Sequence, residues 1–437
     1  MGANGVKIVV LIAIGTVLVI IVIFVLLVIR YRKRNNEKRN GIETKGLTNE
    51  KGLPRIIRQQ QISCDEDYLK TNKNLLDQNA LAVLEAPTQV LVDPNKDIKT
   101  QIKIIGLNSK REVPRSAFEV TEVLGSGNFG TVYKGTLKGL FGRDSKTDIA
   151  IKTVVCYGET EEEDRDRKDF LGEIKIMGYV DPHLNLVSMI ASCTDSHKEM
   201  WLLLEYCPFG DLKHYLIQNY QNLSKEHQDG SSNIRCLIKW TYHISNGMEY
   251  LMEKKIMHGD LAARNVMLAE DPLNIGEKVA KIADFGLSKN FYSKHTYEKC
   301  SRLMIPWRWM GLEYLNKGYF VLKSDVWSFA VLLWEIFSLG SLPYGMLEYN
   351  EVLDKLNNGY RLPFPNEILG TTINSAPSLL YTKIVDRCFV VDPEHRADFK
   401  EVSTIIETFL SGDELMNYRR MTEEYNAKAK TYFKLNV

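Results

Sequence analysis

Residues 125–132, with the sequence G-S-G-N-F-G-T-V, form a glycine-rich stretch whose residue types and spacing suggest chemistry. Glycine lets a backbone approach phosphate oxygens closely because it carries no Cβ. The spacing G-x-G-x-x-G is weak evidence by itself, since it also opens dinucleotide-binding folds, in which the last glycine begins a helix. Here the β-branched residues Thr131 and Val132 follow Gly130 and favour a strand. The stretch therefore predicts a glycine-rich hairpin that covers phosphates.

Three other short stretches place charged or amide side chains at characteristic intervals. They are I-A-I-K at 149–152, H-G-D-L-A-A-R-N at 258–265 and D-F-G at 284–286. A lone lysine on a strand, or an isolated D-F-G, carries little information. In this order, with about twenty residues between the second and third stretches, they resemble the motifs of protein kinases. The chain is identified on these motifs as a member of that family.

The resemblance implies a role for each polar residue of these motifs. In kinases the residues that correspond to Lys152 and Glu173 form an ion pair that positions the α- and β-phosphates. Asp260 stands where the family has the base that accepts the proton of the substrate hydroxyl. Arg264 is expected to help place the substrate side chain.

The resemblance also predicts ATP and Mg²⁺ as cofactors. Asn265 and Asp284 stand where kinases bind the metal. The nucleotide would lie between the glycine-rich hairpin, the strand that carries Lys152 and a hinge segment near residues 204–207, with Leu204 at the gatekeeper position. Its expected contacts are Leu124, Gly125, Ser126, Gly127, Asn128, Phe129, Gly130, Val132, Ala150, Lys152, Glu205 and Cys207.

P-H-L-N-L-V at 182–187 and E-Y-C-P-F-G-D-L at 205–212 resemble the growth-factor-receptor branch of the family. Two further stretches resemble tyrosine kinases in general. L-A-A-R after Asp260 is the tyrosine-kinase form, whereas serine/threonine kinases carry a lysine two residues after the aspartate. P-W-R-W-M at 306–310 resembles a shelf for a long aromatic substrate side chain. Protein tyrosine residues are therefore the expected substrates. A serine/threonine kinase is one alternative, and a catalytically weak or dead scaffold that other kinases phosphorylate is another.

Two positions depart from the family pattern. Gly259 replaces an arginine that in kinases contacts the phosphorylated activation segment, so we expect weaker coupling between activity and phosphorylation of Tyr292 or Tyr297. G-L-E at 311–313 replaces A-P-E. Glu313 is retained, and Arg396 is its expected partner.

The expected fold class is α+β, a two-lobed kinase fold behind one transmembrane helix. The kinase domain would span residues 113–410, with a β-rich lobe at 113–205 and a helical lobe at 208–410 that contains a central helix at 324–337. The tail at 411–437 carries tyrosines at 418, 425 and 432. Their spacing fits docking sites for phosphotyrosine-binding adaptors, but equally one face of a helix packed on the domain.

The run from residue 8 to residue 29 is uncharged and apolar, and it predicts a membrane anchor. As a helix its roughly 22 residues would be about 33 Å long, enough to cross a bilayer. Basic residues at 30–39 favour a cytosolic kinase domain and an external stub at residues 1–7. Such a stub is too short to form a ligand-binding domain, so a receptor would need a partner subunit or a homodimer. Residues 30–112 would be a juxtamembrane segment. Its basic cluster is either a stop-transfer signal or a contact for anionic lipid.

Composition limits the other functions. The formal net charge is +1, which argues against nucleic acid as the main partner because phosphate contacts need an excess of Lys and Arg. The seven cysteines are scattered and show no metal-ligand spacing, as in reduced cytosolic domains. The expected location is the plasma membrane, with a single span.

Overall fold

The computed structural model describes residues 105–127, 130–140, 145–155, 161–195, 199–224, 234–285, 306–369 and 374–432. The predicted stub, anchor and most of the juxtamembrane segment lie outside these residues, as do Asn128, Phe129, Tyr292 and Tyr297. Within the described ranges, no helix is long and apolar enough to cross a membrane. The anchor at residues 8–29 therefore stays a prediction.

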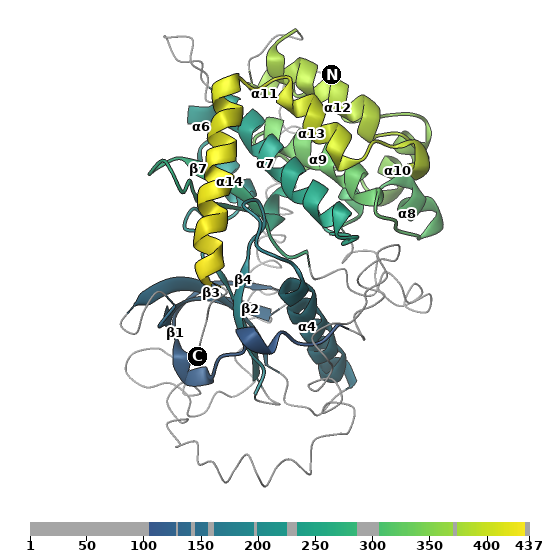
Figure 1. Cartoon of the computed structure of the whole chain (residues 1–437). Coiled ribbons are helices and arrows are strands. Elements are labelled where there is room, and N and C mark those ends of the chain that lie inside the picture. The colour runs from purple at the N-terminus through teal and green to yellow at the C-terminus, as the bar shows by residue number, and fades with distance from the viewer. Residues whose placement is uncertain are drawn as a thin grey trace, which may run out of the picture. The chain divides into compact units, whose positions relative to one another are not determined.

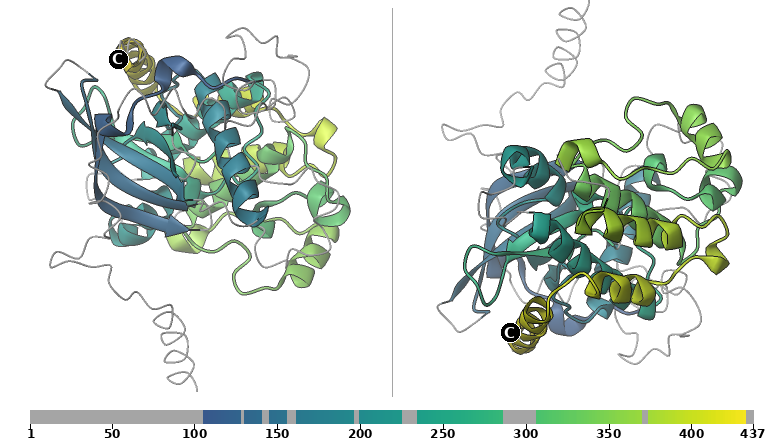
Figure 2. Two further views of the ribbon diagram at one scale, coloured as in Figure 1. Left: turned by 90° about the horizontal axis from the view of Figure 1, so that it is seen from below. Right: turned by 90° about the horizontal axis from the view of Figure 1, so that it is seen from above.

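The amino-terminal lobe is built on one antiparallel sheet with the strand order β1-β2-β3-β5-β4 (Figure 1). Its strands are β1 (Phe118–Gly127), β2 (Gly130–Lys138), β3 (Lys146–Val155), β4 (Met189–Cys193) and β5 (Glu199–Glu205). Helix α4 (Glu161–Tyr179) contacts β3 and β4, and Figure 2 (left) shows it beside the strands.

Alternation along β3 separates the core of this lobe from the nucleotide side. Successive side chains of a strand point to opposite faces of its sheet. Ile149 and Ile151 therefore enter a small core with Phe118 and Trp201, and both isoleucines are fully buried. Lys152 points to the other face, where α4 lies. The pattern of the strand thus fixes which face can hold charged groups.

The carboxy-terminal lobe is a group of helices around α9 (Ser324–Phe337). Thirteen of the fourteen residues of α9 are buried, so it is a central helix enclosed on nearly all sides. The longer helices around it are α7 (Ile234–Glu253), α10 (Tyr349–Asn357), α12 (Ala376–Cys388) and α13 (Phe399–Glu407). The shorter ones are α5 (Leu212–Gln218), α6 (Tyr220–Leu223), α8 (Leu312–Lys317) and α11 (Asn366–Leu369).

A short hairpin at the junction of the lobes lies between the segments that hold the expected catalytic residues. It consists of β6 (Val266–Glu270) and β7 (Lys278–Ile282), and it follows a 3₁₀ turn at Ala263–Asn265. A β-bridge from Leu186 to Ile282 connects it to the segment that leads into β4. The two-lobed architecture confirms the expected kinase fold, whereas the transmembrane part of that prediction remains untested.

The described part of the chain ends in a long helix, α14 (Gly412–Tyr432), which packs on the domain. Tyr418 and Tyr425 both face the body, and Tyr425 is only 7% exposed. The contacts of these two tyrosines agree with the second interpretation of the tail, a helical face packed on the domain.

Candidate active site

Lys152 connects three elements that meet in the cleft. Its Nζ lies 2.8 Å from Oε1 of Glu173 on α4 and 2.9 Å from Oδ1 of Asp284, which follows β7. The Lys152 and Glu173 side chains are nearly inaccessible, while that of Asp284 is 39% exposed. Burial opposes the charge of Lys152, but Asp284 and Glu173 outweigh it and raise the pKa of Lys152. The ammonium is therefore charged throughout the ordinary pH range.

Asp260 is oriented by two neighbours in its own loop. Asn265 Nδ2 donates to Oδ2 of Asp260 at 2.8 Å and to its backbone carbonyl at 2.7 Å, and the guanidinium of Arg264 contacts Oδ1. Burial raises the pKa of Asp260 even though Arg264 and Asn265 act in the opposite direction. The result is a fixed carboxylate that is more basic than an exposed aspartate.

Helix α9 binds the backbone of the loop at residues 258–265. The carboxylate of Asp325 accepts from the backbone N–H groups of His258 at 2.6 Å and Gly259 at 2.8 Å. Gly259 has φ of +81°, a conformation that glycine adopts far more easily than other residues. The glycine found in place of the family's arginine therefore suits the local backbone.

A second carboxylate of α9 connects the loop to the expected substrate shelf. Glu335 Oε2 accepts from the backbone N–H of Ala263 at 3.0 Å and from Nε1 of Trp309 at 2.7 Å. The guanidinium carbon of Arg264 lies 4.5 Å from the centroid of a Trp309 ring. Arg264 is thus held between the shelf and Asp260, where it can contact a substrate side chain.

The glycine-rich hairpin lies beside β3 in the same sheet. Val132 pairs with Lys152 across the sheet. A Cβ on Gly130 would approach the carbonyl oxygen of Thr153 to 2.3 Å, and Gly130 has φ of +106°, so this position requires glycine. Asn128 and Phe129, two expected nucleotide contacts, lie outside the described residues.

The expected adenine side of the cleft is formed by β3, β5 and the hinge. Ala150 pairs with Leu204 of β5, next to Glu205 at the end of the strand. Leu124 on β1 is 45% exposed and Cys207 is 7% exposed. Burial raises the pKa of the Cys207 thiol, so it remains protonated and apolar in character. These groups suit a flat, largely apolar ligand.

The oxygen atoms of Asn265 and Asp284 fit a hard cation such as Mg²⁺. Lys152 contacts Oδ1 of Asp284, and Asn265 uses its Nδ2 to hold Asp260, which leaves Oδ2 of Asp284 and Oδ1 of Asn265 to a metal. In the described part of the chain there is no cluster of three or more His, Cys, Asp or Glu side chains that could bind a metal. Phosphate oxygens would therefore have to complete the coordination, as is usual for Mg²⁺ with nucleotides.

Comparison with known proteins identifies the family. The family model described as "Protein tyrosine and serine/threonine kinase" matches residues 118–406, well over half of the chain. The chain belongs to this kinase family. The resemblance to receptor-type tyrosine kinases is confirmed by relatives with such names.

Three relatives illustrate the similarity. This kinase is 33% identical over 302 residues to the tyrosine kinase receptor Cad96Ca of Drosophila melanogaster, covering 68% of the chain and 36% of the relative. It is 33% identical over 318 residues to a fibroblast growth factor receptor of Ciona intestinalis, covering 70% and 40%. It is 34% identical over 289 residues to the tyrosine protein-kinase src-1 of Caenorhabditis elegans, covering 66% and 48%. The chain thus spans less than half the length of each.

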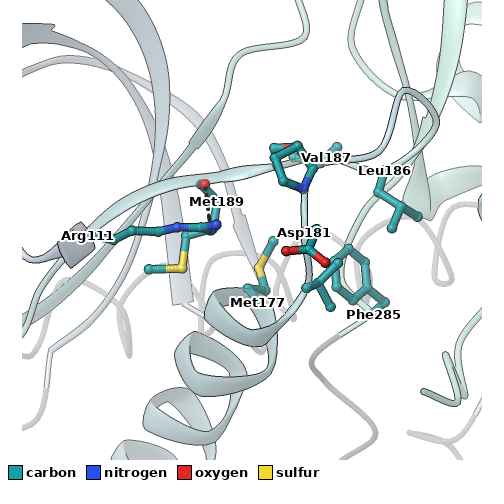
Figure 3. A pocket seen from close by; sticks show the side chains of 10 residues that line it. Arg111, Met177, Asp181, Leu186, Val187, Met189 and Phe285 are labelled. Atoms are coloured by element: carbon teal, nitrogen blue, oxygen red, sulfur yellow. Dashed lines mark hydrogen bonds between the residues drawn. The ribbon is translucent and has the colours of Figure 1, made fainter. Parts of the chain in front are cut away.

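A small cavity lies behind the cleft of this kinase (Figure 3). It is bordered by the end of α4 at Met177, by Met189 of β4 and by Phe285, with Arg111 and Asp181 at its edge. Its volume of about 10 Å³ is space for no more than about one water molecule. Phe285 is buried and packs inward against the end of α4. Because the cavity is so small, it is no nucleotide site.

Two features of the kinase site were missed by sequence reasoning. Glu335 is a charged residue within the otherwise apolar run of α9, and that contrast could have identified it. The ion pair between Lys281 Nζ and Oε1 of Glu205, 3.0 Å apart, joins β7 to the hinge and has no local sequence signal.

Proposed function

We propose that this chain transfers the γ-phosphoryl group of ATP to tyrosine side chains of proteins. The observation that carries the proposal is the simultaneous contact of Lys152 with Glu173 and Asp284, opposite the Asp260 carboxylate held by Arg264 and Asn265. A scaffold that no longer transfers phosphate has no need to keep this arrangement.

Lys152 would bind the α- and β-phosphates, with Glu173 keeping its ammonium in place. Its present contact with Asp284 shows that the ammonium and the metal-binding carboxylate share one small space. Bound Mg²⁺, held by Asn265 and Asp284, would neutralise charge on the transferred phosphoryl group. Most of the catalysis would come from such positioning and electrostatic stabilisation.

Asp260 would orient the tyrosine hydroxyl and accept its proton as the oxygen attacks phosphorus. The raised pKa of Asp260 makes its carboxylate a better proton acceptor than an exposed aspartate. Arg264, stacked on Trp309, would support the phenol ring of the substrate. The position of this guanidinium favours tyrosine over the shorter serine and threonine side chains.

The test uses the purified full-length chain with Mg²⁺, ATP and two peptides that differ only in tyrosine against serine. We expect transfer to the tyrosine peptide, and a fall of about 10²- to 10⁴-fold in kcat for Asp260→Asn, as for loss of a general base. Preference for the serine peptide would refute tyrosine specificity. Failure of the wild-type chain to bind Mg²⁺-ATP and to transfer phosphate would support the scaffold alternative.

We further propose that the kinase is anchored in the plasma membrane by residues 8–29, with its amino terminus outside. The apolar run and the basic residues that follow it support this placement. Protease protection of intact cells that express the chain with an amino-terminal epitope tests the orientation. Loss of the epitope with a protected kinase domain is the expected result, and a protected epitope would contradict it.

A further inference from the structure

Helix α14 lies against both lobes behind the hinge. Figure 1 shows it running from the helical lobe toward the strands. Met421, Tyr425 and Ala429, on one face of the helix, are buried in a cluster with Leu184 and Val279. Leu184 belongs to the connection between α4 and β4, whereas Val279 belongs to β7. The apolar face of α14 therefore covers the place where the segment before β4 pairs with β7, next to the hinge.

Tyr425 forms the most polar contact of this face. Its hydroxyl lies 2.7 Å from Oγ of Ser188 and 3.2 Å from Oε2 of Glu205, the last residue of β5 before the hinge. Lys281 Nζ lies 4.0 Å from the centroid of the Tyr425 ring. The same ammonium pairs with Oε1 of Glu205. Tyr425 thus contacts three segments at once, which are the hinge, the residues just before β4, and strand β7.

Tyr418 fixes the helix one step nearer the helical lobe. Its hydroxyl is 2.7 Å from Oδ1 of Asn185, and its ring stacks on His243 with centroids 5.5 Å apart. Asn185 in turn donates to the carbonyl of Ala280 on β7 at 3.0 Å. At its start the helix is held by an ion pair between Glu414 and Arg235 of α7. The Tyr425 hydroxyl therefore binds α14 to the hinge, and the Tyr418 hydroxyl binds it to the segment before β4.

We propose that α14 is an intramolecular strap on the hinge and that Tyr425 is a phosphorylation site whose modification releases it. The proposal rests on the tyrosine kinase activity proposed above. Tyr425 is 7% exposed when the strap is bound, so the hydroxyl becomes a substrate only after transient detachment, in the active site of a second copy. A bond forms between the Tyr425 oxygen and the γ-phosphorus, the bond from that phosphorus to the β–γ bridging oxygen breaks, the hydroxyl proton passes to Asp260, and ADP leaves.

Phosphorylated Tyr425 does not fit the bound strap. The phosphate carries roughly 1.5 to 2 negative charges and would lie against the carboxylate of Glu205 in a space that now holds one hydroxyl. The nearby cation, Lys281, is already paired with Glu205. Phosphorylation would therefore trap the detached helix.

Release of the strap should change nucleotide exchange more than the chemical step. None of the residues bound by α14 is Lys152, Asp260 or Asp284, but Glu205 borders the expected adenine site and Lys281 lies on β7 just before Asp284. A hinge free of the strap opens more readily, and product release limits turnover in many enzymes that close over their ligands. We expect ADP to dissociate about tenfold faster from the released form, the effect of losing one or two hydrogen bonds to a charged network.

The first experiment measures the strap without catalysis. In the full-length chain carrying Asp260→Asn, Tyr425→Phe removes both hydroxyl contacts and Tyr425→Glu adds a charge beside Glu205. Amide hydrogen exchange of residues 412–432 and the dissociation rate of a fluorescent ADP are measured, with Tyr220→Phe, an exposed tyrosine of α6, as the matched control. We expect both quantities to rise in the order Tyr220→Phe, Tyr425→Phe, Tyr425→Glu. Equal values for all three would overturn the strap.

The second experiment tests the modification. The full-length chain with an intact Asp260 is incubated with Mg²⁺-ATP, and the phosphate on Tyr425, α14 exchange and ADP dissociation are followed together. Phosphate at Tyr425 that accompanies faster exchange and release supports the proposal, and phosphate there with α14 still protected refutes it. An active enzyme that never modifies Tyr425 refutes the modification site but not the strap. A chain without any transfer, whose Asp260→Asn variants still follow the expected order, would refute the kinase proposal alone.

Discussion

Two buried ion pairs of this kinase have similar burial but different surroundings. Glu313 and Arg396 form a two-pronged pair in the helical lobe, with both N···O distances 3.0 Å. Arg396 also donates to the carbonyls of Lys323 and Val390, and Ser324 donates to Glu313. Lys152, by contrast, divides its ammonium between Glu173 and Asp284, and Asp284 faces the cleft.

The difference separates a structural contact from a functional one. The Glu313–Arg396 pair is surrounded by fixed protein groups, so neither partner can accept another ligand without leaving the core. Under the proposed function, Lys152 would exchange Asp284 for a phosphate while Glu173 continues to hold it. A buried charge that serves chemistry therefore keeps one partner at an accessible surface. Matched substitutions in the two pairs test this distinction.

Glu313→Gln should have the largest effect on stability. The amide keeps the shape of the side chain but leaves the buried charge of Arg396 without a counter-charge. Loss of one partner from such a pair lowers the free energy of unfolding by about 3–5 kcal/mol. Denaturant unfolding of the purified chain measures this, and the folded fraction should keep near wild-type kcat. A loss of under about 1 kcal/mol would show that the pair is not the structural element we infer.

Glu173→Gln is the matched change in the cleft. Lys152 keeps Asp284 as a counter-charge, so we expect the free energy of unfolding to fall by only about 1–2 kcal/mol, near the value for one hydrogen bond to a charged group. Misplacement of the ammonium should lower kcat/KM by about 10- to 100-fold, which corresponds to about 1.4–2.8 kcal/mol of transition-state stabilisation. Unfolding and steady-state kinetics on the same preparation give both values. Equal stability losses in Glu313→Gln and Glu173→Gln would refute the distinction between the structural and the functional ion pair.

The pH dependence of activity sharpens the view of the cleft. Burial raises the pKa of Asp260, while Lys152 lowers the pKa of Asp284 against the effect of burial. Asp260 must be unprotonated to accept a proton, so kcat/KM should fall as the pH drops through its raised pKa, while Asp284 remains charged. The acidic limb should therefore lie above the ordinary aspartate range, with ADP affinity unchanged there. Glu313→Gln should keep the same limb, and a shifted limb in that variant would contradict the separation of the two pairs.

Gly259→Arg should have the smallest effect on stability. A residue with a Cβ at this positive φ destabilises the loop by about 1 kcal/mol, and Gly259→Ala, which adds no charge, should lose as much. In the wild type we expect Phe at both Tyr292 and Tyr297 to reduce the rate far less than Asp260→Asn. Gly259→Arg should make the rate more dependent on those tyrosines, and Gly259→Ala should not. Initial rates of wild type, Gly259→Arg and Gly259→Ala, each with and without Phe at both tyrosines, decide this. An unchanged dependence in Gly259→Arg would refute the role assigned to Gly259.

Much of the fold was predictable because local patterns encode it. The mostly apolar run at 324–337 predicted a helix, its resemblance to kinases implied a central one, and α9 has those bounds. The β-branched residues after Gly130 predicted a hairpin instead of a helix, and β1 and β2 form one. The structure also joins Lys152 to Glu173, the pair that the resemblance implied, and adds Asp284 as a second partner of Lys152.

Contacts between distant side chains could not be predicted in the same way. Glu335 and Ala263 are separated by 72 residues, and Tyr425 and Glu205 by 220. No periodicity of one segment records which side chain of another it will meet. The tail tyrosines show this limit most clearly, since their spacing permits both a docking role and a packed face. Only the contacts of Tyr418 and Tyr425 separate these two interpretations for the bound state.

One carboxylate oxygen, Oε2 of Glu335, serves both the backbone of the catalytic loop and the indole of the substrate shelf. A substitution that moved Trp309 to admit a different side chain would also displace Ala263, which lies between the proposed proton acceptor and the proposed metal ligand of the loop. Under the proposed function, substrate preference and turnover would therefore be linked in this chain. We expect variants that accept a new target sequence through changes at Trp309 to show a changed turnover rate as well.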